Sequence, residues 1–537
     1  MDQIHKLRSY QIAAILLFIG ILLLIFITFR DYGISWDEQA YSLYGKALID
    51  YYLGLLHGAP DMTATSIHNL QLDGGTYDLF SALAVRLLER MTSYGVMELH
   101  HLVNALTGFL GLIGAWATVR LLAGDKAAFW SALFLAIIPA YYGHIFFNPK
   151  DIPFAVGYIW SLYFLIRILR DFPLVKWKSL AFFGVVSGLT LGIRIGGVFL
   201  FGYFGLALLW NYWRVFRSGS SAGFKTFIRL LALPVGFTGL IAYIVMLAFW
   251  PWALQNPIRY PIQALIGMRQ YFWPSTVLYR GQFIVASDLP ADYILRYLAI
   301  SLPELLLLLL LAGILVTIVR WLINRHVGVS PSLRVLGSSL LVISVIIPII
   351  TAILGHSTVY DGIRHFLFVI PPLACLAGLS FQFFLDQLSA MNIKLVYIAI
   401  LLMAVYLAYQ ISVMIRLHPY EYIYYNQLVG GVTHAYQEYE TDYWGTSASQ
   451  AAKWLVHSLE KNGISTGGKV KVFVTGATEY SAQYYFPDWI ELADDKYEAD
   501  YMIGGIRWFS WGEMPGVELY TVSRMGVPLV VIKDLKP

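Results

Sequence analysis

The sequence predicts a polytopic α-helical membrane protein with a small α/β domain at its C-terminal end. Hydrophobic residues make up 58% of the 537 and charged residues only 13%, roughly half the charged share of an average soluble domain. Many apolar stretches have about 20 residues, the length that crosses a hydrocarbon core of about 30 Å. After residue 415 the pattern changes to mixed strand, helix and turn signals. We therefore expect a transmembrane part, 1–415, and an α/β domain, 416–537.

Eleven membrane spans are predicted from the apolar stretches. The first follows Lys6 and Arg8 and runs from Ile12 to Thr28. We interpret it as a retained span, because it is long for a signal sequence and Phe29-Arg30-Asp31 offers no small-residue cleavage site. The other ten are expected near residues 99–120, 127–146, 153–170, 179–197, 198–213, 230–250, 300–320, 335–355, 365–385 and 395–415.

Basic residues recur in every second connection between these spans, as the positive-inside rule expects of cytoplasmic loops. This pattern predicts a cytoplasmic N-terminus and places residues after about 416 outside the cytoplasm. The other outer segments are 29–98, 147–152, 251–299 and 356–364. The basic residues include Arg120, Lys126, Arg167, Arg170, Arg214, Arg217 and Lys394.

Two outer regions have structure of their own. Residues 37–56 and 78–91 of the first outer loop are predicted as helices, and amphipathic segments of this kind commonly lie along the membrane interface. In the C-terminal domain we expect a helix from Ser447 to Lys461 and a strand from Lys469 to Thr475. Another strand near 501–504 and a hairpin over 518–533 complete the α/β pattern.

Acidic residues gather at the outer face. Asp37 and Glu38 follow the first span, and Asp151 lies in the short loop after the third. Two carboxylate clusters at one depth suit a base that activates a hydroxyl group, or a divalent cation (Mg²⁺ or Mn²⁺) bound by oxygen ligands. The alternatives are that Asp37 and Glu38 are solvated loop residues and that Asp151, beside Lys150, caps the fourth span.

Candidate binding groups lie on the same face. Arg364 and His365 open the tenth span, and Arg194 lies in an apolar, glycine-rich segment where an unpaired charge is unfavourable by several kcal/mol. Guanidinium groups suit phosphate recognition because their paired donors match its oxygens. Aromatic rings beside amides and acids suit a sugar site, although a membrane-interface girdle also explains them. Candidates for sugar or acceptor binding are His144, Asn148, Tyr360, His418, Tyr425 and Asn426.

Together these features resemble the membrane glycosyltransferases with the C-type fold, in particular protein O-mannosyltransferases and bacterial aminoarabinose transferases of lipid A. The resemblance covers roughly the first 410 residues. It rests on Trp36-Asp37-Glu38 after the first span, the interfacial helices, the loop Asn148-Pro-Lys-Asp151, and Arg364-His365 at the start of a proline-containing span. The outer C-terminal domain fits as well.

The resemblance implies a donor sugar linked through phosphate to a polyprenyl chain, and its transfer to an acceptor hydroxyl outside the cytoplasm, usually with inversion. It implies that Asp37 is the base with Glu38 supporting it, and that Asp151 is a second acid. Lys150, Arg364 and His365 would hold the donor phosphate. The segment from His418 to Trp444 departs from the pattern of protein mannosyltransferases. The sugar, hexose or pentose, and the acceptor, glycan, lipid or protein, therefore stay open.

Two other classes of function are compatible with the sequence. A transporter or flippase of lipid-linked sugars is less favoured, because we find neither a repeat nor several charges within the spans. A noncatalytic subunit whose outer domain recruits a partner is the third possibility. The net charge of +4 and the lack of a basic run argue against nucleic acid, and the single Cys375 excludes an intrachain disulfide. We expect the location to be a prokaryotic cytoplasmic membrane.

Overall fold

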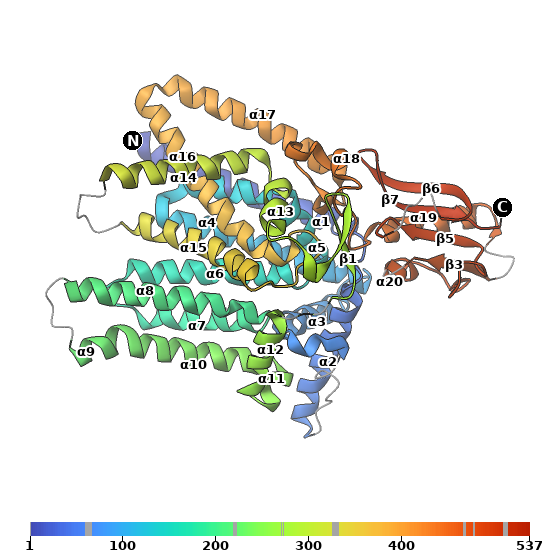
Figure 1. Cartoon of the computed structure of the whole chain (residues 1–537), viewed down its shortest axis with the longest axis horizontal. Helices are drawn as coiled ribbons and strands as arrows, with labels where there is room; N and C mark the ends of the chain where they lie inside the picture. Colours follow the sequence, from blue (N-terminus) through green and yellow to red (C-terminus); the bar gives the residue numbers. More distant parts are fainter. Residues whose placement is uncertain are drawn as a thin grey trace.

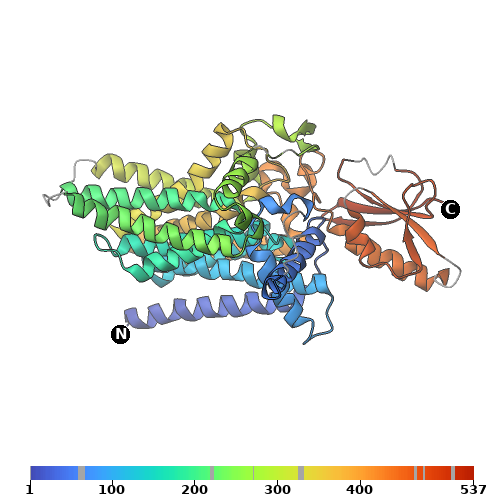
Figure 2. The same cartoon turned by 90° about the horizontal axis from the view of Figure 1, so that it is seen from below.

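The computed structural model describes residues 2–58, 67–217, 223–269, 271, 273–324, 332–464, 469–475, 478–508 and 514–536. A bundle of helices forms the larger part, and a small sheet domain projects from one end of it (Figure 1). The N-terminus lies at the opposite end, as the view from below also shows (Figure 2). The predicted architecture, a helical membrane protein with a small C-terminal α/β domain, is confirmed.

Within the described residues, eight helices are long and apolar enough to cross a membrane, or nine if the bent pair α13 (Tyr293–Ser301) and α14 (Glu304–Asn324) forms one span. Each predicted span overlaps at least one helix of the bundle. The remaining helices of the bundle are α1 (Asp2–Thr28), α4 (Val96–Ala136), α5 (Pro139–Phe147), α6 (Asp151–Arg170), α7 (Trp177–Leu191), α8 (Val198–Arg217), α10 (Leu233–Ala248), α15 (Leu333–Leu354), α16 (Ile370–Met391) and α17 (Ile393–Leu417).

Helix α4 accounts for part of the difference between eight helices and eleven predicted spans. A straight helix of its 41 residues would be about 60 Å long, twice the hydrocarbon thickness. At Gly124 the backbone leaves the helical region, with φ 81° and ψ −175°. Tyr141 donates a hydrogen bond of 2.9 Å to the carbonyl of Gly108, so the chain after Gly124 returns beside the chain before it. The predicted spans 99–120 and 127–146 are the two arms of this hairpin.

Two short segments account for the rest. Helix α7 has 15 residues, fewer than a full span needs. Helix α14 is bent by 116° relative to α13, so the predicted span 300–320 begins at this break and consists mainly of α14. The number of crossings, eleven, stays a prediction.

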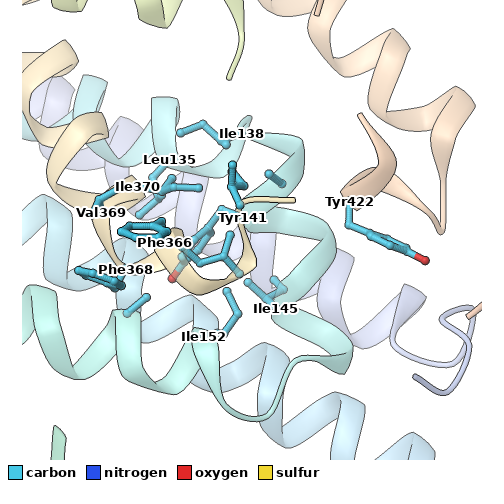
Figure 3. Packing of buried hydrophobic residues seen from close by; sticks show 14 of the residues in the cluster. Leu135, Ile138, Tyr141, Ile145, Ile152, Phe366, Phe368, Val369, Ile370 and Tyr422 are labelled. Carbon is cyan, nitrogen blue, oxygen red and sulfur yellow. The ribbon is translucent and has the colours of Figure 1, made fainter. Parts of the chain in front are cut away.

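A dense apolar core lies beneath the end of the bundle that carries the sheet domain. There the 3₁₀ helix η6 (Arg364–Val369) packs on α6, and α16, which continues from it, packs on α4. Figure 3 shows the ring of Phe366 and the side chains of Val369 and Ile370 facing Leu135 and Ile138. Because a close-packed interior holds side chains in single positions, this packing fixes where η6 begins.

Loops at the same end of the bundle hold short elements. Helices α2 (Glu38–Leu56) and α3 (Thr76–Leu88) confirm the two helices predicted in the first outer loop. The loop 251–299, which the sequence left unassigned, contains α11 (Pro251–Gln255), α12 (Arg259–Arg269) and the hairpin of β1 (Thr276–Tyr279) and β2 (Gln282–Val285).

The C-terminal domain is a five-stranded sheet with the order β4-β3-β5-β7-β6. Strands β4, β3 and β5 are parallel, whereas β7 and β6 add an antiparallel hairpin. Helix α19 confirms the predicted helix from Ser447 to Lys461. The elements are α19 (Ser447–Lys461), β3 (Val470–Val474), α20 (Glu479–Gln483), β4 (Ile490–Leu492), β5 (Tyr501–Gly505), β6 (Val517–Arg524) and β7 (Val527–Asp534).

Candidate active site

Four predicted site residues lie where helices begin, at the end of the bundle that faces the C-terminal domain. Asp37 is the N-cap of α2, and Asp151 is the first residue of α6. Arg364 opens η6, and Arg194 precedes the 3₁₀ helix η3 (Ile195–Gly197). The four charged groups therefore lie at the same end of the bundle, each fixed by the start of a helix.

Asp37 and Arg364 form a direct contact. Arg364 Nη1 donates a hydrogen bond of 2.9 Å to Asp37 Oδ2. The Asp37 side chain is 34% exposed, whereas that of Arg364 is only 8% exposed. The Arg364 guanidinium also lies 4.9 Å from the ring centroids of both Tyr360 and Trp444, which suits a desolvated cation. Burial raises the pKa of Asp37, and the neighbouring Arg364 partly opposes this rise.

A second arginine, from the C-terminal domain, joins this contact. Asp361 is fully buried, and its two oxygens lie 3.4 Å from Arg364 Nε and 2.5 Å from Arg507 Nη2. The same Arg507 nitrogen lies 3.1 Å from Glu440 Oε1. Acidic and basic side chains thus alternate along the cluster, in the order Asp37, Arg364, Asp361, Arg507 and Glu440. The membrane part and the C-terminal domain build this cluster together.

The loop that carries Asp37 is held by the C-terminal domain as well. The backbone of Ile34 accepts a hydrogen bond from Ser481 Oγ at 2.6 Å and donates one to Ser449 Oγ at 3.0 Å. Gly33 approaches the carbonyl of Thr446 so closely that a Cβ atom would lie 1.9 Å from its oxygen. The approach therefore requires glycine at position 33. These contacts fix the position of the loop, and with it that of Asp37.

Asp151 lies in a neighbouring cluster. Its Oδ1 pairs with Arg194 Nη2 at 2.8 Å, and its Oδ2 accepts a hydrogen bond from Asn148 at 3.0 Å. His144 Nε2 lies 2.9 Å from the hydroxyl of Tyr443. Asp151 is near enough to Asp37 for their negative charges to interact. The predicted residues His144, Asn148, Asp151 and Arg194 therefore share one region with Asp37.

Glu38 and Lys150 face away from this region. Glu38 Oε2 accepts a hydrogen bond of 2.6 Å from the backbone nitrogen of Ser35, and its Oε1 lies 3.0 Å from His101 Nε2. The Lys150 ammonium is 2% exposed and lies 3.1 Å from Asp78 Oδ2. Both side chains hold α2 and α3 against the bundle, so in this structure Lys150 is engaged by the chain itself.

Of the aromatic and amide candidates, Tyr360 belongs to the region of Asp37. Its ring stacks on Trp273 with centroids 4.4 Å apart, and the ring of His365 meets it edge-on at 4.6 Å. Tyr360 and His365 therefore form an aromatic wall beside Arg364.

His418, Tyr425 and Asn426 make structural contacts. His418 lies between Glu421, at 2.9 Å, and Asp31, at 3.1 Å. Tyr425 donates to the carbonyl of Glu440, whereas Asn426 donates to two carbonyls at the end of α13. These side chains join segments of the chain, so we leave them out of the proposed site.

The three predicted metal ligands do not converge. Asp37 faces Arg364, Glu38 faces His101, and Asp151 faces Arg194. Throughout the described ranges, no group of three or more His, Cys, Asp or Glu side chains is arranged to hold a metal ion. The side chains as they lie therefore do not fit a shared divalent cation, and no step below uses one.

Sequence reasoning missed Asp361 and Arg507. Asp361 is followed by Gly362, and both have positive φ, so a turn immediately before Arg364 was a detectable signal. Arg507 follows a predicted strand and precedes Trp508, in a domain with few arginines. Neither signal could indicate that the two residues meet across 146 positions.

Known proteins share this fold. ArnT from Cupriavidus metallidurans in the apo state aligns over 97% of this chain and 98% of its own, with a TM-score of 0.50 and 16% identity. The same protein bound to undecaprenyl phosphate aligns over 96% and 97%, with a TM-score of 0.49 and 16% identity. The oligosaccharyltransferase of Archaeoglobus fulgidus in the apo form covers 90% of this chain and 65% of its own, with a TM-score of 0.44 and 11% identity.

In sequence, residues 95–237 match the family model described as dolichyl-phosphate-mannose-protein mannosyltransferase. No curated protein matches the chain significantly. The matched segment covers α4 to α8 and the start of α10, including Asp151 and Arg194. The fold and this match confirm that the chain resembles the membrane glycosyltransferases with the C-type fold.

Proposed function

We propose that the protein transfers a sugar from a polyprenyl-phosphate donor to an acceptor hydroxyl, with inversion at the anomeric carbon. One observation carries the proposal: a half-exposed carboxylate, Asp37, lies 2.9 Å from the guanidinium of a buried arginine, Arg364. A base and an anion-binding group are thus in direct contact. The matching family description names a lipid-phosphate sugar donor, and one ArnT structure contains undecaprenyl phosphate.

Each group has a defined part in this reaction. Asp37 removes the proton of the acceptor hydroxyl as its oxygen attacks the anomeric carbon. The bond from that carbon to the donor phosphate oxygen breaks, and its electron pair leaves with the phosphate. Arg364 stabilises the charge that develops there, because its paired donors match two phosphate oxygens. The products are the glycosylated acceptor and free polyprenyl phosphate.

Donor binding also activates the base. In the unliganded contact, Arg364 opposes the rise in the pKa of Asp37 that burial causes. A phosphate bound to Arg364 neutralises part of this positive charge, so the pKa of Asp37 rises further. A carboxylate with a higher pKa is a stronger base. Asp37 therefore becomes most reactive when the donor is in place.

Arg194 and His365 complete the donor side of the proposal. Arg194 is 24% exposed and pairs with Asp151, so it keeps surface available to a second phosphate oxygen. Asp151 and Asn148 orient Arg194, and His365 borders the aromatic wall beside Arg364. Lys150 supports the site indirectly, because its ion pair with Asp78 holds α3 in place.

We further propose that the protein lies in a prokaryotic cytoplasmic membrane with its N-terminus in the cytoplasm and the site outside. The positive-inside pattern supports this orientation, because Arg120, Arg170 and Arg217 lie near helix ends or breaks remote from the site. The sugar is a hexose or a pentose.

The decisive test is the release of polyprenyl phosphate. Purified protein in lipid nanodiscs receives a synthetic polyprenyl-phosphate hexose or pentose together with an envelope extract as acceptor, and the lipid products are measured by mass spectrometry. We expect free polyprenyl phosphate to accumulate only when the acceptor is present. A flippase or a noncatalytic subunit would release none, which would refute the proposal.

A further inference from the structure

One side chain of the C-terminal domain reaches the charged cluster of the candidate active site. Arg507 follows strand β5, and its side chain is only 10% exposed. Its Nη2 lies 2.5 Å from Asp361 Oδ1 and 3.1 Å from Glu440 Oε1. Its Nη1 donates a hydrogen bond of 2.5 Å to the carbonyl of Tyr443. Both terminal nitrogens of this arginine are therefore engaged by the chain.

Aromatic rings surround the same guanidinium. It lies 4.8 Å from the ring centroid of Trp36, 5.4 Å from that of Trp273 and 4.4 Å from that of Trp508. Rings at these distances attract a desolvated cation. Arg507 is thus held in one position and is covered, so it acts on the site through its partners and not by direct contact with a donor.

Asp361 connects Arg507 with Arg364. This carboxylate is fully buried, and each of its oxygens faces a different arginine. Oδ1 lies 2.5 Å from Arg507, whereas Oδ2 lies 3.4 Å from Arg364 Nε and accepts a hydrogen bond of 3.3 Å from Trp444. Arg364 Nε forms no hydrogen bond with the part of the chain that the structure describes. Asp361 is therefore bonded mainly to Arg507.

This division of partners keeps the charge of Arg364 available to a phosphate. A buried carboxylate attracts a neighbouring cation strongly, because its surroundings screen charge weakly. Without Arg507, Arg364 would have to compensate Asp361 alone among the described residues. Glu440 competes little for Arg507, because burial raises the pKa of Glu440 and favours its neutral form.

The same contact holds the turn that leads to Arg364. Asp361 and Gly362 have φ values of 57° and 65°, a left-handed conformation that is uncommon for residues other than glycine. The ion pair with Arg507 stabilises the turn, as does a hydrogen bond of 3.1 Å from the Gly362 nitrogen to the hydroxyl of Tyr293. Because Arg364 begins η6 two residues later, the turn sets the position of its guanidinium.

We propose that Arg507 is a positioning residue, supplied by the C-terminal domain, which neutralises Asp361 and so leaves Arg364 free to bind the donor phosphate. This inference rests on the proposed function, in which Arg364 holds that phosphate. The alternative is that Arg507 only attaches the domain. Arg524 of the same domain is a matched control for attachment, because it donates hydrogen bonds of 2.8 Å to the carbonyl of His418, directly after α17, and of 3.1 Å to Gln450.

Binding of a short-chain polyprenyl phosphate to the full-length protein in nanodiscs, with no acceptor present, tests the inference. In Arg507→Gln we expect about tenfold weaker binding, comparable to the loss of one charged hydrogen bond. Arg524→Gln should bind normally. Thermal midpoints of the same samples separate stability from affinity.

Two double variants distinguish positioning from attachment. Asp361→Asn/Arg507→Gln and Arg507→Gln/Glu440→Gln each remove the arginine together with one of its acids, so neither leaves both acids charged and unpaired. Asparagine also tolerates the left-handed conformation. Only the Asp361 double variant should regain nearly wild-type affinity, because only Asp361 contacts both arginines. Attachment alone predicts equal affinities for the two double variants.

Weak binding in Arg507→Gln and in the Glu440 double variant, with recovery in the Asp361 double variant and normal binding in Arg524→Gln, supports the inference. Equal affinities of the two double variants, equal losses in Arg507→Gln and Arg524→Gln, or no binding by the wild-type protein overturn it. Sugar transfer is measured separately. Arg507-dependent binding without transfer counts against the proposed function alone, whereas transfer with Arg507-independent binding overturns only the inference.

Discussion

Two acid–base contacts at the same end of the molecule have nearly the same length but different surroundings. Asp37 and Arg364 meet at 2.9 Å, and Lys150 and Asp78 meet at 3.1 Å. The Asp37 side chain is 34% exposed, whereas Lys150 and Asp78 are 2% and 1% exposed. Arg364 has a second acidic partner, Asp361, while the main acidic partner of Lys150 is Asp78.

These different surroundings indicate which of the two pairs is free to react. Removing one member of a buried pair leaves an uncompensated charge, so such a pair has a structural role. Arg364 keeps Asp361 when Asp37 is altered or protonated, so the fold does not depend on the Asp37 contact. Exposure and a second partner, more than the length of the contact, distinguish the proposed reacting pair from the supporting one.

The largest effect is expected from Asp37→Asn, which keeps the shape but removes the base. Transfer should fall by about 10²- to 10⁴-fold, the usual contribution of a general base. Because burial raises the pKa of Asp37, the folded chain binds this proton more tightly than the unfolded chain, and ionisation at neutral pH opposes folding. The thermal midpoint in detergent should therefore stay the same or rise. Substantial turnover by a well-folded variant would remove Asp37 as the base.

Lys150→Met should lower the stability of the folded protein. It leaves Asp78 buried without a cation, and the free energy of unfolding should fall by about 3–5 kcal/mol. Denaturation in mild detergent measures the loss, and the double variant Lys150→Met/Asp78→Leu should recover part of it. A Lys150→Met protein with normal stability and weakened donor binding would instead assign the lysine to the phosphate.

Arg364→Lys should have a smaller effect on transfer. Lysine keeps the charge but not the paired donors, so about one charged hydrogen bond, worth about 1.5–3 kcal/mol, is lost. We expect kcat/KM for the donor to fall by about 10- to 100-fold, with a normal thermal midpoint. An unchanged kcat/KM would show that Arg364 does not hold the donor phosphate.

The pH profile should show the ionisation of Asp37. Its pKa lies above its ordinary value of 3.8, and the carboxylate form is needed, so activity is present above this pKa and falls about tenfold per pH unit below it. Arg364 opposes the rise, so in Arg364→Gln the acidic limb should move to higher pH. If activity falls at the same pH in Arg364→Gln as in the wild-type protein, Arg364 does not influence the pKa of Asp37.

Chelation should produce the smallest change. Asp37, Glu38 and Asp151 face three different partners, so transfer should continue after treatment with EDTA. Activity that is lost on chelation and restored by Mg²⁺ or Mn²⁺ would show that the acids rearrange around a metal in the working enzyme.

Several parts of this arrangement followed from local sequence. Apolar length and basic residues predicted the helices, and the position of Asp37 after the first span predicted its place at the end of the bundle. Arg364 could be identified for the same reason, because it begins a span. These properties depend on residues that are close in sequence.

Contacts between distant segments could not be predicted in this way. Glu38 stands beside Asp37 in the sequence, but the helical turn directs it to His101. Lys150 was predicted to bind the donor phosphate, but α3 places Asp78 beside its ammonium group. The pairing of Asp361 with Arg507 depends on how the domain docks, and no local pattern encodes that docking.

The docking of the domain has a consequence for biogenesis. The contacts of Gly33 with Thr446, of Ile34 with Ser481, and of Asp361 with Arg507 all involve residues that follow every predicted span. During synthesis these residues leave the ribosome after all the predicted spans. The helices can insert and pack earlier, but the loop of Asp37 gains its final position only after the domain has folded. An incompletely made chain would therefore occupy the membrane without consuming lipid-linked sugar.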